Sequence, residues 1–282
     1  MTAVDTTRTS ALALPAAERI RSENSIIALA EQSVVQCKRL VITWLRDIPT
    51  LAQALAFPAL TLVMFKIVLG DSITMATGMP SVYGQVPMIM LVGAMTGATV
   101  SGIYLNVERR TGLLSRFATM PVHRASGLAG RLLAEALRVL TTSIVVMLTG
   151  VILGFRFHQG FFAGVALVLL PVLFGVAFAL PITAMATVSG GARLVELTGL
   201  LITLLMFFNS GFVPVLAYPT WLQSTVANQP MSCAIEAMRG LSLGGPVQEP
   251  LLKTVAWCVG LVVVFTYPAV RGYRAAAEQG GE

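Results

Sequence analysis

The stretch ERRTGLLSRFATMPVHR, residues 108–124, is the most polar part of an otherwise apolar chain. Only 11% of the 282 residues are charged, whereas an ordinary soluble domain has about 25%. Six arginines nevertheless fall within residues 108–138: Arg109, Arg110, Arg116, Arg124, Arg131 and Arg138. A membrane protein keeps so polar a segment outside the bilayer. We therefore read it as a loop, placed by the apolar runs on either side.

The remainder of the chain is too apolar for a soluble domain. Hydrophobic residues make up 56% of the sequence, and the mean hydropathy is +0.80. Several uncharged runs reach the roughly 20 residues that a helix needs to cross a bilayer. The sequence therefore predicts an all-α polytopic membrane protein.

Two segments are expected ahead of the first membrane span: a flexible tail over residues 1–23 and an amphipathic helix over residues 24–48. In that helix apolar residues recur at steps of three and four, at Ile26, Ala30, Val34, Cys37, Val41, Leu45 and Ile48. Polar and charged residues fill the other positions. Such a helix lies in the membrane interface; the alternative is a helix packed on a soluble partner.

Six spans are expected, at about residues 49–70, 85–105, 136–154, 162–188, 195–212 and 251–270. Together they form a transmembrane domain over residues 49–271, followed by a cytoplasmic tail over residues 272–282. In the second span Gly93, Gly97 and Ser101 recur every four residues, a pattern that lets two helices approach closely. Such a stripe suits packing within a chain as well as contact between subunits.

One charge-free stretch, residues 197–235, is far longer than a single span requires. Pro214, Pro219 and Pro230 interrupt its second half, and Trp221 is of a type found at membrane interfaces. We therefore expect this half to dip into the outer leaflet and return, as a re-entrant segment between the fifth and sixth spans.

The distribution of positive charge predicts the orientation. Of the 19 Lys and Arg, 15 lie on the side of the termini and the charged loop and three on the opposite side; Lys66 lies inside the first span. The positive-inside rule then places both termini and the loop in the cytoplasm, with the chain in the cytoplasmic (inner) membrane. Because these charges sit at the ends of apolar runs, they indicate topology and no nucleic-acid partner.

Several kinds of chemistry are excluded. No expected span has a central Asp, Glu or His, as a proton-coupled exporter requires. His123 and His158 fall on opposite sides of the bilayer, and no HxxxH or HExxH spacing occurs. One GxSxG does occur, at residues 240–244, but the strand before it and the helix after it that a nucleophile elbow needs are not expected there. A phosphate-binding GxxxxGK[ST] loop is also missing. We expect no enzyme activity, cofactor or metal in this chain, so the energy for any work must come from another chain.

Apolar residues alternate with the arginines of the charged loop. Leu113, Leu114, Phe117 and Met120 predict a short amphipathic helix that ends near Pro121. A loop that meets anionic lipid headgroups would explain the arginines alone. The apolar residues favour docking into a groove of a partner protein.

Three segments together resemble the ABC-2 type exporter permeases, in particular the daunorubicin-resistance-like branch of actinobacteria. They are the loop 108–124, SGFVPVLAYPTWLQ at residues 210–223 and NQPMSCAIEAMRGL at residues 228–241. With the amphipathic helix, the resemblance extends over about residues 25–274.

The resemblance implies a six-helix permease that works as a dimer, either with a related second permease or with itself. Two copies of a separate ABC ATPase subunit, which binds ATP and Mg²⁺, would drive it. The loop would contain the coupling helix, supported at the membrane surface by the 24–48 helix. The residues expected to contact the ATPase are Glu108, Arg109, Arg110, Gly112, Leu113, Arg116, Phe117, Met120, Pro121, His123 and Arg124.

On the outer side the resemblance implies a re-entrant gate over the exit route. Its expected residues are Pro214, Pro219, Trp221, Pro230, Glu236 and Arg239. Glu236 and Arg239, three apart on a helix, either neutralise each other there or form a surface pair.

The transported molecule is expected to be hydrophobic or amphipathic, a cell-envelope lipid or a drug. Spans with few polar groups suit such a molecule, taken sideways from the membrane lipids, better than a sugar chain. The alternatives are polysaccharide or teichoic-acid export, or a non-transporting membrane subunit that binds an ATPase.

Overall fold

A computed structural model describes residues 25–118, 123, 125–188 and 191–278. These residues are largely helical, and no strand occurs among them. The elements in chain order are α1 (Ile26–Arg46), α2 (Ile48–Thr77), α3 (Val82–Arg110), α4 (Leu113–Ala118), α5 (Ser126–Ile152), α6 (Phe161–Thr187), α7 (Gly191–Phe207), the 3₁₀ turn η1 (Val215–Ala217), α8 (Thr220–Asn228), α9 (Pro230–Leu243) and α10 (Gln248–Glu278).

Five helices within the described residues are long and apolar enough to cross a membrane: α2, α3, α5, α6 and α10. Each has 27 to 31 residues, or about 40–47 Å at 1.5 Å per residue, and so exceeds the ~30 Å hydrocarbon core. The protein is therefore a multi-pass helical membrane protein. Helix α7, in the region of the expected fifth span, has 17 residues, about 26 Å. Six crossings stay a prediction.

The connection between α2 and α3 is shorter than expected. The expected spans leave residues 71–84 between them, whereas α2 ends at Thr77 and α3 begins at Val82. Helix α2 continues to Thr77, and Gly78 ends it with a φ of 69°, a conformation that favours glycine. Pro58 lies inside α2 without ending it. The two helices are thus joined by a short turn, and α2 extends well beyond its apolar span.

Helix α5 begins at Ser126, ahead of the apolar run that starts at Ala136. Arg131, expected in the polar loop, therefore lies in a helix, as does Arg138, which is counted with the loop but falls within the expected third span. Arg131 is 4% exposed. The loop assignment of Arg131 was wrong, because its charge is compensated within the protein by Glu108 and needs no contact with water.

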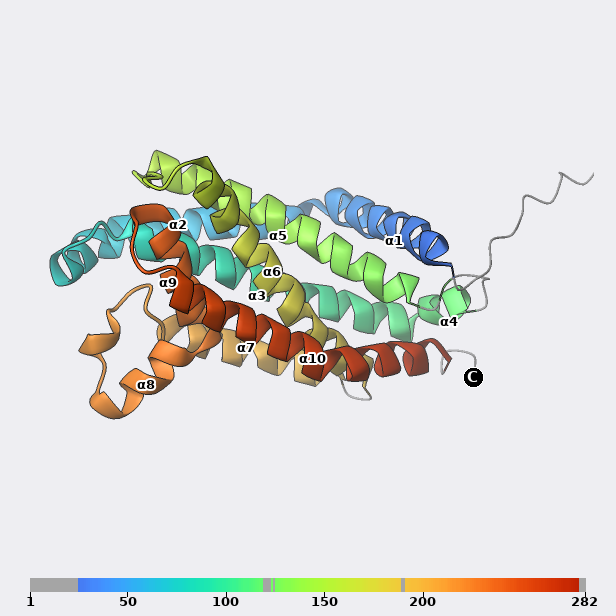
Figure 1. Ribbon diagram of the computed structural model, residues 1–282. Coiled ribbons are helices and arrows are strands. Elements are labelled where there is room, and N and C mark those ends of the chain that lie inside the picture. Colours follow the sequence, from blue (N-terminus) through green and yellow to red (C-terminus); the bar gives the residue numbers. More distant parts are fainter. Residues whose placement is uncertain (1–24, 119–122, 124, 189–190, 279–282) are drawn as a thin grey trace, which may run out of the picture.

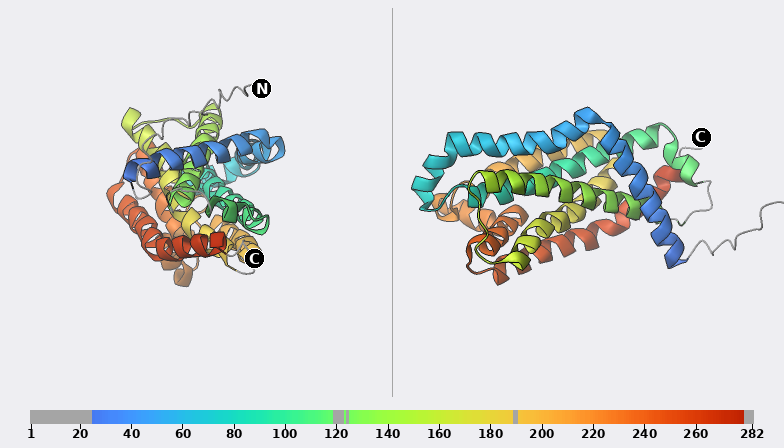
Figure 2. Two further views of the ribbon diagram at one scale, coloured as in Figure 1. Left: turned by 90° about the vertical axis from the view of Figure 1, so that its right-hand side faces the viewer. Right: turned by 90° about the horizontal axis from the view of Figure 1, so that it is seen from above.

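The elements divide between the two ends of the helix bundle (Figure 1). Helices α1 and α4 and the last turns of α10 lie at one end, on the right of Figure 1, and η1, α8 and α9 lie at the other. Seen from above, α1 runs at a steep angle to α2 (Figure 2). We refer to these as the α4 end and the α8–α9 end.

Helices α3 and α6 form the centre of the bundle. The first ten residues of α3, 82–91, are all buried, and α6 buries Phe174, Phe178 and Ile182. Helix α6 packs against α3, α5 and α10. Apolar residues of α2, α7 and α10 remain exposed, among them Phe57, Leu200 and Val263, so these helices present apolar faces to lipid or to another subunit.

The apolar stripe expected on α1 mostly faces outward. Ile26 and Val34 are 82% and 60% exposed. Smaller residues, including Ser33 and Cys37, pack on α5, where a Cβ at Gly130 would lie 2.8 Å from the Ser33 carbonyl oxygen. Helix α1 is thus fixed by small residues and exposes its large apolar side chains, as an interfacial helix requires.

The small residues of α3 pack against α5 within the chain. A Cβ at Gly93 would lie 3.2 Å from Cγ2 of Thr142, and one at Gly97 would lie 3.0 Å from Nη2 of Arg138. The third member of the stripe, Ser101, accepts a hydrogen bond at its carbonyl oxygen from Arg131, at 3.4 Å. An intramolecular contact therefore accounts for the stripe.

Candidate functional site

Helix α4 is a short helix between the ends of α3 and α5. Gly112 has a φ of 69° in the turn that precedes it. Leu114 is 2% exposed and belongs to the hydrophobic core, so it anchors the helix. Leu113 is half-buried and Arg116 is exposed. Helix α4 is thus anchored in the bundle through Leu114, while Leu113 is only partly covered and Arg116 is exposed.

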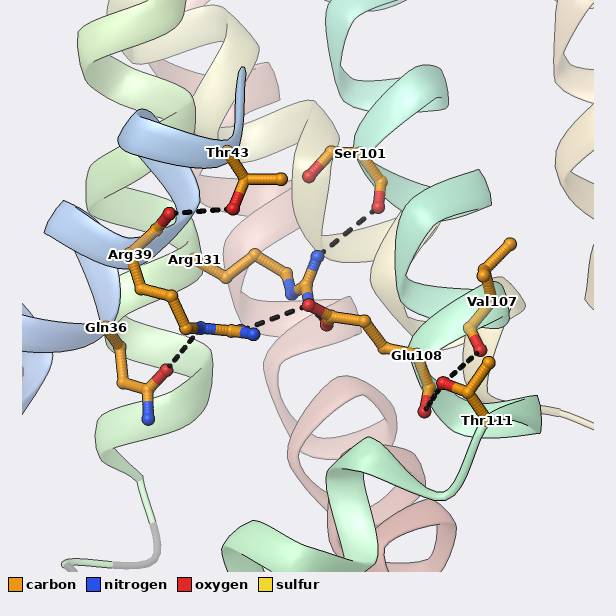
Figure 3. Close-up of polar contacts among 8 residues, drawn as sticks. All are labelled: Gln36, Arg39, Thr43, Ser101, Val107, Glu108, Thr111 and Arg131. Atoms are coloured by element: carbon orange, nitrogen blue, oxygen red, sulfur yellow. Dashed lines mark hydrogen bonds and ion pairs between the residues drawn. The ribbon is translucent and has the colours of Figure 1, made fainter. Parts of the chain in front are cut away.

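Glu108, in the last turn of α3, pairs with arginines from two other helices (Figure 3). Its Oε1 lies 3.1 Å from Nη2 of Arg39 in α1, and its Oε2 accepts a hydrogen bond from Nη2 of Arg131 in α5. Gln36 Oε1 accepts from Nε of Arg39 at 3.1 Å. One carboxylate therefore joins α1, α3 and α5. We call Arg39, Glu108 and Arg131 the Glu108 cluster.

The two ion pairs of the cluster differ in burial. The side chain of Arg131 is 5% exposed, that of Glu108 17% and that of Arg39 33%. Removing one partner of a buried pair leaves an uncompensated charge and costs about 3–5 kcal/mol. An exposed pair contributes about 1 kcal/mol or less. The Glu108–Arg131 pair is therefore the firm contact, and the Arg39 pair is the weaker one.

A second ion pair joins Glu135 and Arg138, further along α5. Their side chains are 2% and 12% exposed. Oε1 of Glu135 and Nε of Arg138 have no hydrogen-bond partner in the part of the chain that the structure describes. Both residues, with Glu108 and Arg131, line a cavity of about 80 Å³ beside α1. Polar side chains of α5 thus follow one another along the helix, from Arg131 in the Glu108 cluster to Glu135 and Arg138.

The junction between α1 and α2 is also held by polar contacts. Asp47 accepts hydrogen bonds from the hydroxyls of Thr50, at 2.6 Å, and of Tyr104 in α3, at 2.5 Å. These bonds, that of the Thr50 hydroxyl above all, lower the pKa of Asp47 because they stabilise the carboxylate. Helix α1 is therefore attached at this junction, at Gly130 and at the Glu108 cluster.

The expected ATPase contacts at the end of α3 differ in their surroundings. Nη1 of Arg109 donates to the carbonyl oxygen of Val188, at the end of α6, at 2.8 Å. Arg110 is exposed. Arg109 therefore connects two helix ends, which leaves Arg110 as the more accessible charge.

His123 connects the start of α5 with α1. Its backbone N–H donates to Oε1 of Gln32 at 2.6 Å, and its Nδ1 accepts from the N–H of Ala125 at 3.1 Å. Three further expected contacts, Met120, Pro121 and Arg124, lie outside the described residues, as does the side chain of Phe117.

Four charged residues of this region are not among the expected site residues: Arg39, Arg131, Glu135 and Arg138. Arg131, Glu135 and Arg138 are spaced by four and three, so they share one face of a helix. That spacing would have identified these three residues as one face of a helix. It was missed because the residues before Ala136 were assigned to a loop.

At the α8–α9 end, polar side chains satisfy carbonyl groups of the last residue of α7 and of the residues just after it. Nη2 of Arg239 donates to the carbonyl oxygen of Ser210 at 2.7 Å, and Nη1 pairs with Glu236 at 2.8 Å. The Tyr218 hydroxyl donates to the carbonyls of Phe207 and Asn209, at 3.2 and 3.1 Å. Carbonyls at helix ends need such partners. The Glu236–Arg239 pair therefore also attaches α9 to the end of α7.

The prolines expected in the outer gate precede or begin the short elements there. Pro214 precedes η1, Pro219 precedes α8 and Pro230 is the first residue of α9. Proline suits a helix start because its fixed φ fits the first turn, where an N–H has no intrahelical partner. Trp221 is 77% exposed. The segment is thus a compact pair of helices with an exposed aromatic side chain.

Comparison with known proteins defines the class to which this arrangement belongs. Residues 31–243 match the ABC-2 type transporter family, so the chain belongs to that family, as the sequence motifs indicate. It is 41% identical over 256 residues to the probable doxorubicin resistance ABC transporter permease protein DrrC of Mycobacterium tuberculosis, covering 91% of this chain and 93% of the relative.

Two further relatives carry similar names. The chain is 29% identical over 224 residues to the daunorubicin resistance ABC transporter permease protein DrrB1 of Streptomyces coeruleorubidus, covering 77% of each chain. It is 26% identical over 201 residues to the doxorubicin resistance ABC transporter permease protein DrrB of Mycobacterium tuberculosis, covering 67% of this chain and 68% of the relative. These relatives are named as permeases of drug-resistance transporters.

Proposed function

We propose that this protein is the membrane permease subunit of an ATP-driven exporter in the cytoplasmic membrane, with both termini in the cytoplasm. Membership of the ABC-2 family and the names of the relatives support this function. The sequence has no phosphate-binding loop. ATP and Mg²⁺ are therefore bound by a separate ATPase, in two copies, beside a permease dimer made with a related chain or with itself.

Helix α4 is the element that docks with the ATPase. The observation that carries this proposal is its anchorage: Leu114 is buried in the bundle, while Leu113 and Arg116 are more accessible. Glu108, four residues before Gly112, connects the same region to α1 and α5. A displacement of α4 by the ATPase is thereby transmitted to three helices.

The α8–α9 pair caps the exit on the opposite side as a re-entrant gate. Its attachment to α7 through Arg239 and Tyr218 supports this role. The cargo is a hydrophobic or amphipathic molecule, a drug or a cell-envelope lipid. Drug resistance in the names of the relatives and the apolar exposed faces of α2, α7 and α10 favour that class.

The test of docking replaces Leu113 and Phe117 with Asp in a permease that is co-expressed with its ATPase. An apolar contact that becomes a charge in a protein groove should abolish co-purification of the ATPase and drug-stimulated ATP hydrolysis. Arg110→Ala is the matched control, since an exposed rim charge mainly affects encounter and orientation.

Two outcomes would contradict the assignment. One is co-purification of the ATPase at wild-type levels with a well-expressed Leu113→Asp/Phe117→Asp variant. The other is a larger loss with Arg110→Ala, which would indicate that the loop meets lipid headgroups. Retained ATPase binding and hydrolysis without any transport of a drug or lipid would favour a non-transporting subunit.

A further inference from the structure

A second, larger cavity lies between α2, α3 and α5. Its volume is about 400 Å³, within the ~300–1,000 Å³ range of ligand-binding pockets. Most of its wall is apolar or formed by small residues, with Phe57, Phe65, Ile89, Val92, Val139 and Met206 among the lining side chains. Of the charged residues that the structure describes, only Arg138 lines it.

Arg138 separates the two cavities of this region. It lines both of them, whereas Glu135 lines only the smaller one. Glu135 bonds to Nη2 of Arg138, and Nε of Arg138 has no hydrogen-bond partner among the described residues. A guanidinium has five N–H donors. The Glu135–Arg138 ion pair is therefore oriented with its positive member at the wall of the larger cavity and its negative member at the smaller one.

Arg138 lies near the middle of α5, where the apolar run of that helix begins. It lies 12 residues after Ser126, the start of α5, or about 18 Å along the helix. The apolar run of α5 begins at Ala136, just before it. The cavity extends from Arg138 and Thr50 alongside apolar segments of α2 and α3 as far as Phe65 and Ile89, so Arg138 marks one end of it and its apolar wall continues along the helices.

The cavity is accessible from the surface of the bundle. Gln53, Phe57 and Met64 of α2 and Thr96 of α3 all line it and are all exposed. Because these residues belong to helices long enough to cross a membrane, the opening lies on the side of the bundle and not at either of its ends. A molecule dissolved in the membrane can reach the cavity without passing through water.

We propose that this cavity binds an anionic amphiphile, with Arg138 contacting the acidic phosphate or carboxylate head and the apolar wall holding the adjoining chain. A guanidinium at the wall of an apolar cavity binds such a head by charge-assisted hydrogen bonds, which are about twice as strong as neutral ones. A cationic head is disfavoured, because Arg138 would repel it at close range. The site goes beyond the proposed function, since it requires neither an ATPase nor transport.

The test uses the purified full chain in nanodiscs of a neutral lipid. The probe is dodecyl phosphate with a photoactivatable diazirine in its chain, and cross-linked peptides are mapped by mass spectrometry. Labelling is expected within residues 53–65 of α2 and 89–100 of α3. Unlabelled dodecyl phosphate and phosphatidylglycerol should compete, whereas dodecyltrimethylammonium should not. Inorganic phosphate as an equally good competitor would identify an anion site without a lipid part and overturn the proposal.

Variants separate the head contact from the chain contact. Arg138→Gln combined with Glu135→Gln avoids an unpaired buried carboxylate and should weaken binding about tenfold or more, because a hydrogen bond to a charged group is lost. Arg138→Lys should retain part of the binding. Ala54→Phe fills the cavity and should abolish labelling with Arg138 intact, whereas Ala52→Phe, outside the lining, should not.

Two results would overturn the site. The first is labelling that Arg138→Gln/Glu135→Gln leaves unchanged, in a variant that elutes as a single species. The second is equal competition by the cationic and the anionic dodecyl compounds. Either result is independent of ATPase docking, so the site and the proposed function fail separately.

Discussion

Glu108 is the single side chain whose removal should most disturb the α4 end. Glu108→Gln leaves Arg131, which is 4% exposed, without its carboxylate partner. The expected loss of stability is about 3–5 kcal/mol, whereas Arg39→Ala should lose about 1 kcal/mol or less because that pair is more exposed. Unfolding of the purified chain in detergent, followed by temperature or denaturant, measures both.

The double variant Glu108→Gln/Arg131→Met is the control for this prediction. It removes both buried charges, and an apolar side chain of similar volume often replaces a buried ion pair without loss. Its stability should therefore exceed that of Glu108→Gln alone. A double variant that is no more stable than Glu108→Gln would contradict the prediction, because the unpaired charge of Arg131 would then not explain the loss.

Asp47 should confer a pH dependence on the junction between α1 and α2. Its pKa is lowered by the hydroxyls of Thr50 and Tyr104, so its contribution is present above the unfolded value of about 3.9 and is lost as pH falls through the lower folded value. Wild type should melt at a higher temperature than Asp47→Asn at pH 7. The two melting temperatures should converge below pH 4; a constant difference would contradict the assignment.

Among the elements, the contact between α1 and α5 depends on a glycine. A Cβ at Gly130 would lie 2.8 Å from the carbonyl oxygen of Ser33 and 3.2 Å from the amide nitrogen of Cys37. Backbone atoms cannot move aside as a flexible side chain can. Gly130→Ala should therefore destabilise the protein by about 1–3 kcal/mol, as overpacking does, and loosen α1, measured by hydrogen exchange of its amides.

Gly199 provides the matched control. It also lies in a helix, α7, but a Cβ there would have no neighbour within 4 Å. Gly199→Ala should be neutral or stabilising by up to about 1 kcal/mol, because alanine restricts the unfolded chain and favours helix. Equal losses for Gly130→Ala and Gly199→Ala would indicate a general effect of the substitution and no specific contact with α1.

At the scale of elements, the sequence predicted the existence of long helices better than their ends. Apolar runs identified the regions of α2, α3, α5, α6 and α10, because a span must be apolar whatever its partners. The start of α5 at Ser126 was not predicted. Arg131 and Arg138 look like loop residues until Glu108 and Glu135 are known to lie beside them.

At the scale of the whole molecule, the sequence did not predict which helices pack against one another. The glycine stripe of α3 indicated a close contact but not that α5 would provide it, since small-residue stripes serve contacts within and between chains alike. The Glu108 cluster unites residues from positions 39, 108 and 131. Such distant partners leave no periodic signal along the chain, so neither this cluster nor the cavity beside Arg138 could be derived.

The orientation of the whole molecule is testable by cysteine labelling in intact cells. The positive-inside rule predicts that the α4 end lies in the cytoplasm, and the structure suggests one reporter for each end. Thr111 is exposed at the α4 end, while Met79, in the turn between α2 and α3, is exposed at the α8–α9 end. Met79 serves better than Asp71, because α2 continues past Asp71 to Thr77.

A membrane-impermeant maleimide should label Met79→Cys and Gln248→Cys in intact cells, and Thr111→Cys only after the membrane is opened. The native cysteines, Cys37, Cys233 and Cys258, are buried, so the unsubstituted chain should give little background. Met79 lies in the turn between α2 and α3, and Gln248 is the first residue of α10. The two reporters therefore test the outer end at two separate points of the chain. Labelling of Thr111→Cys from outside would reverse the orientation and exclude α4 from contact with a cytoplasmic ATPase. Labelling of only one outer reporter would mean an odd number of crossings between them and would overturn the six-span topology.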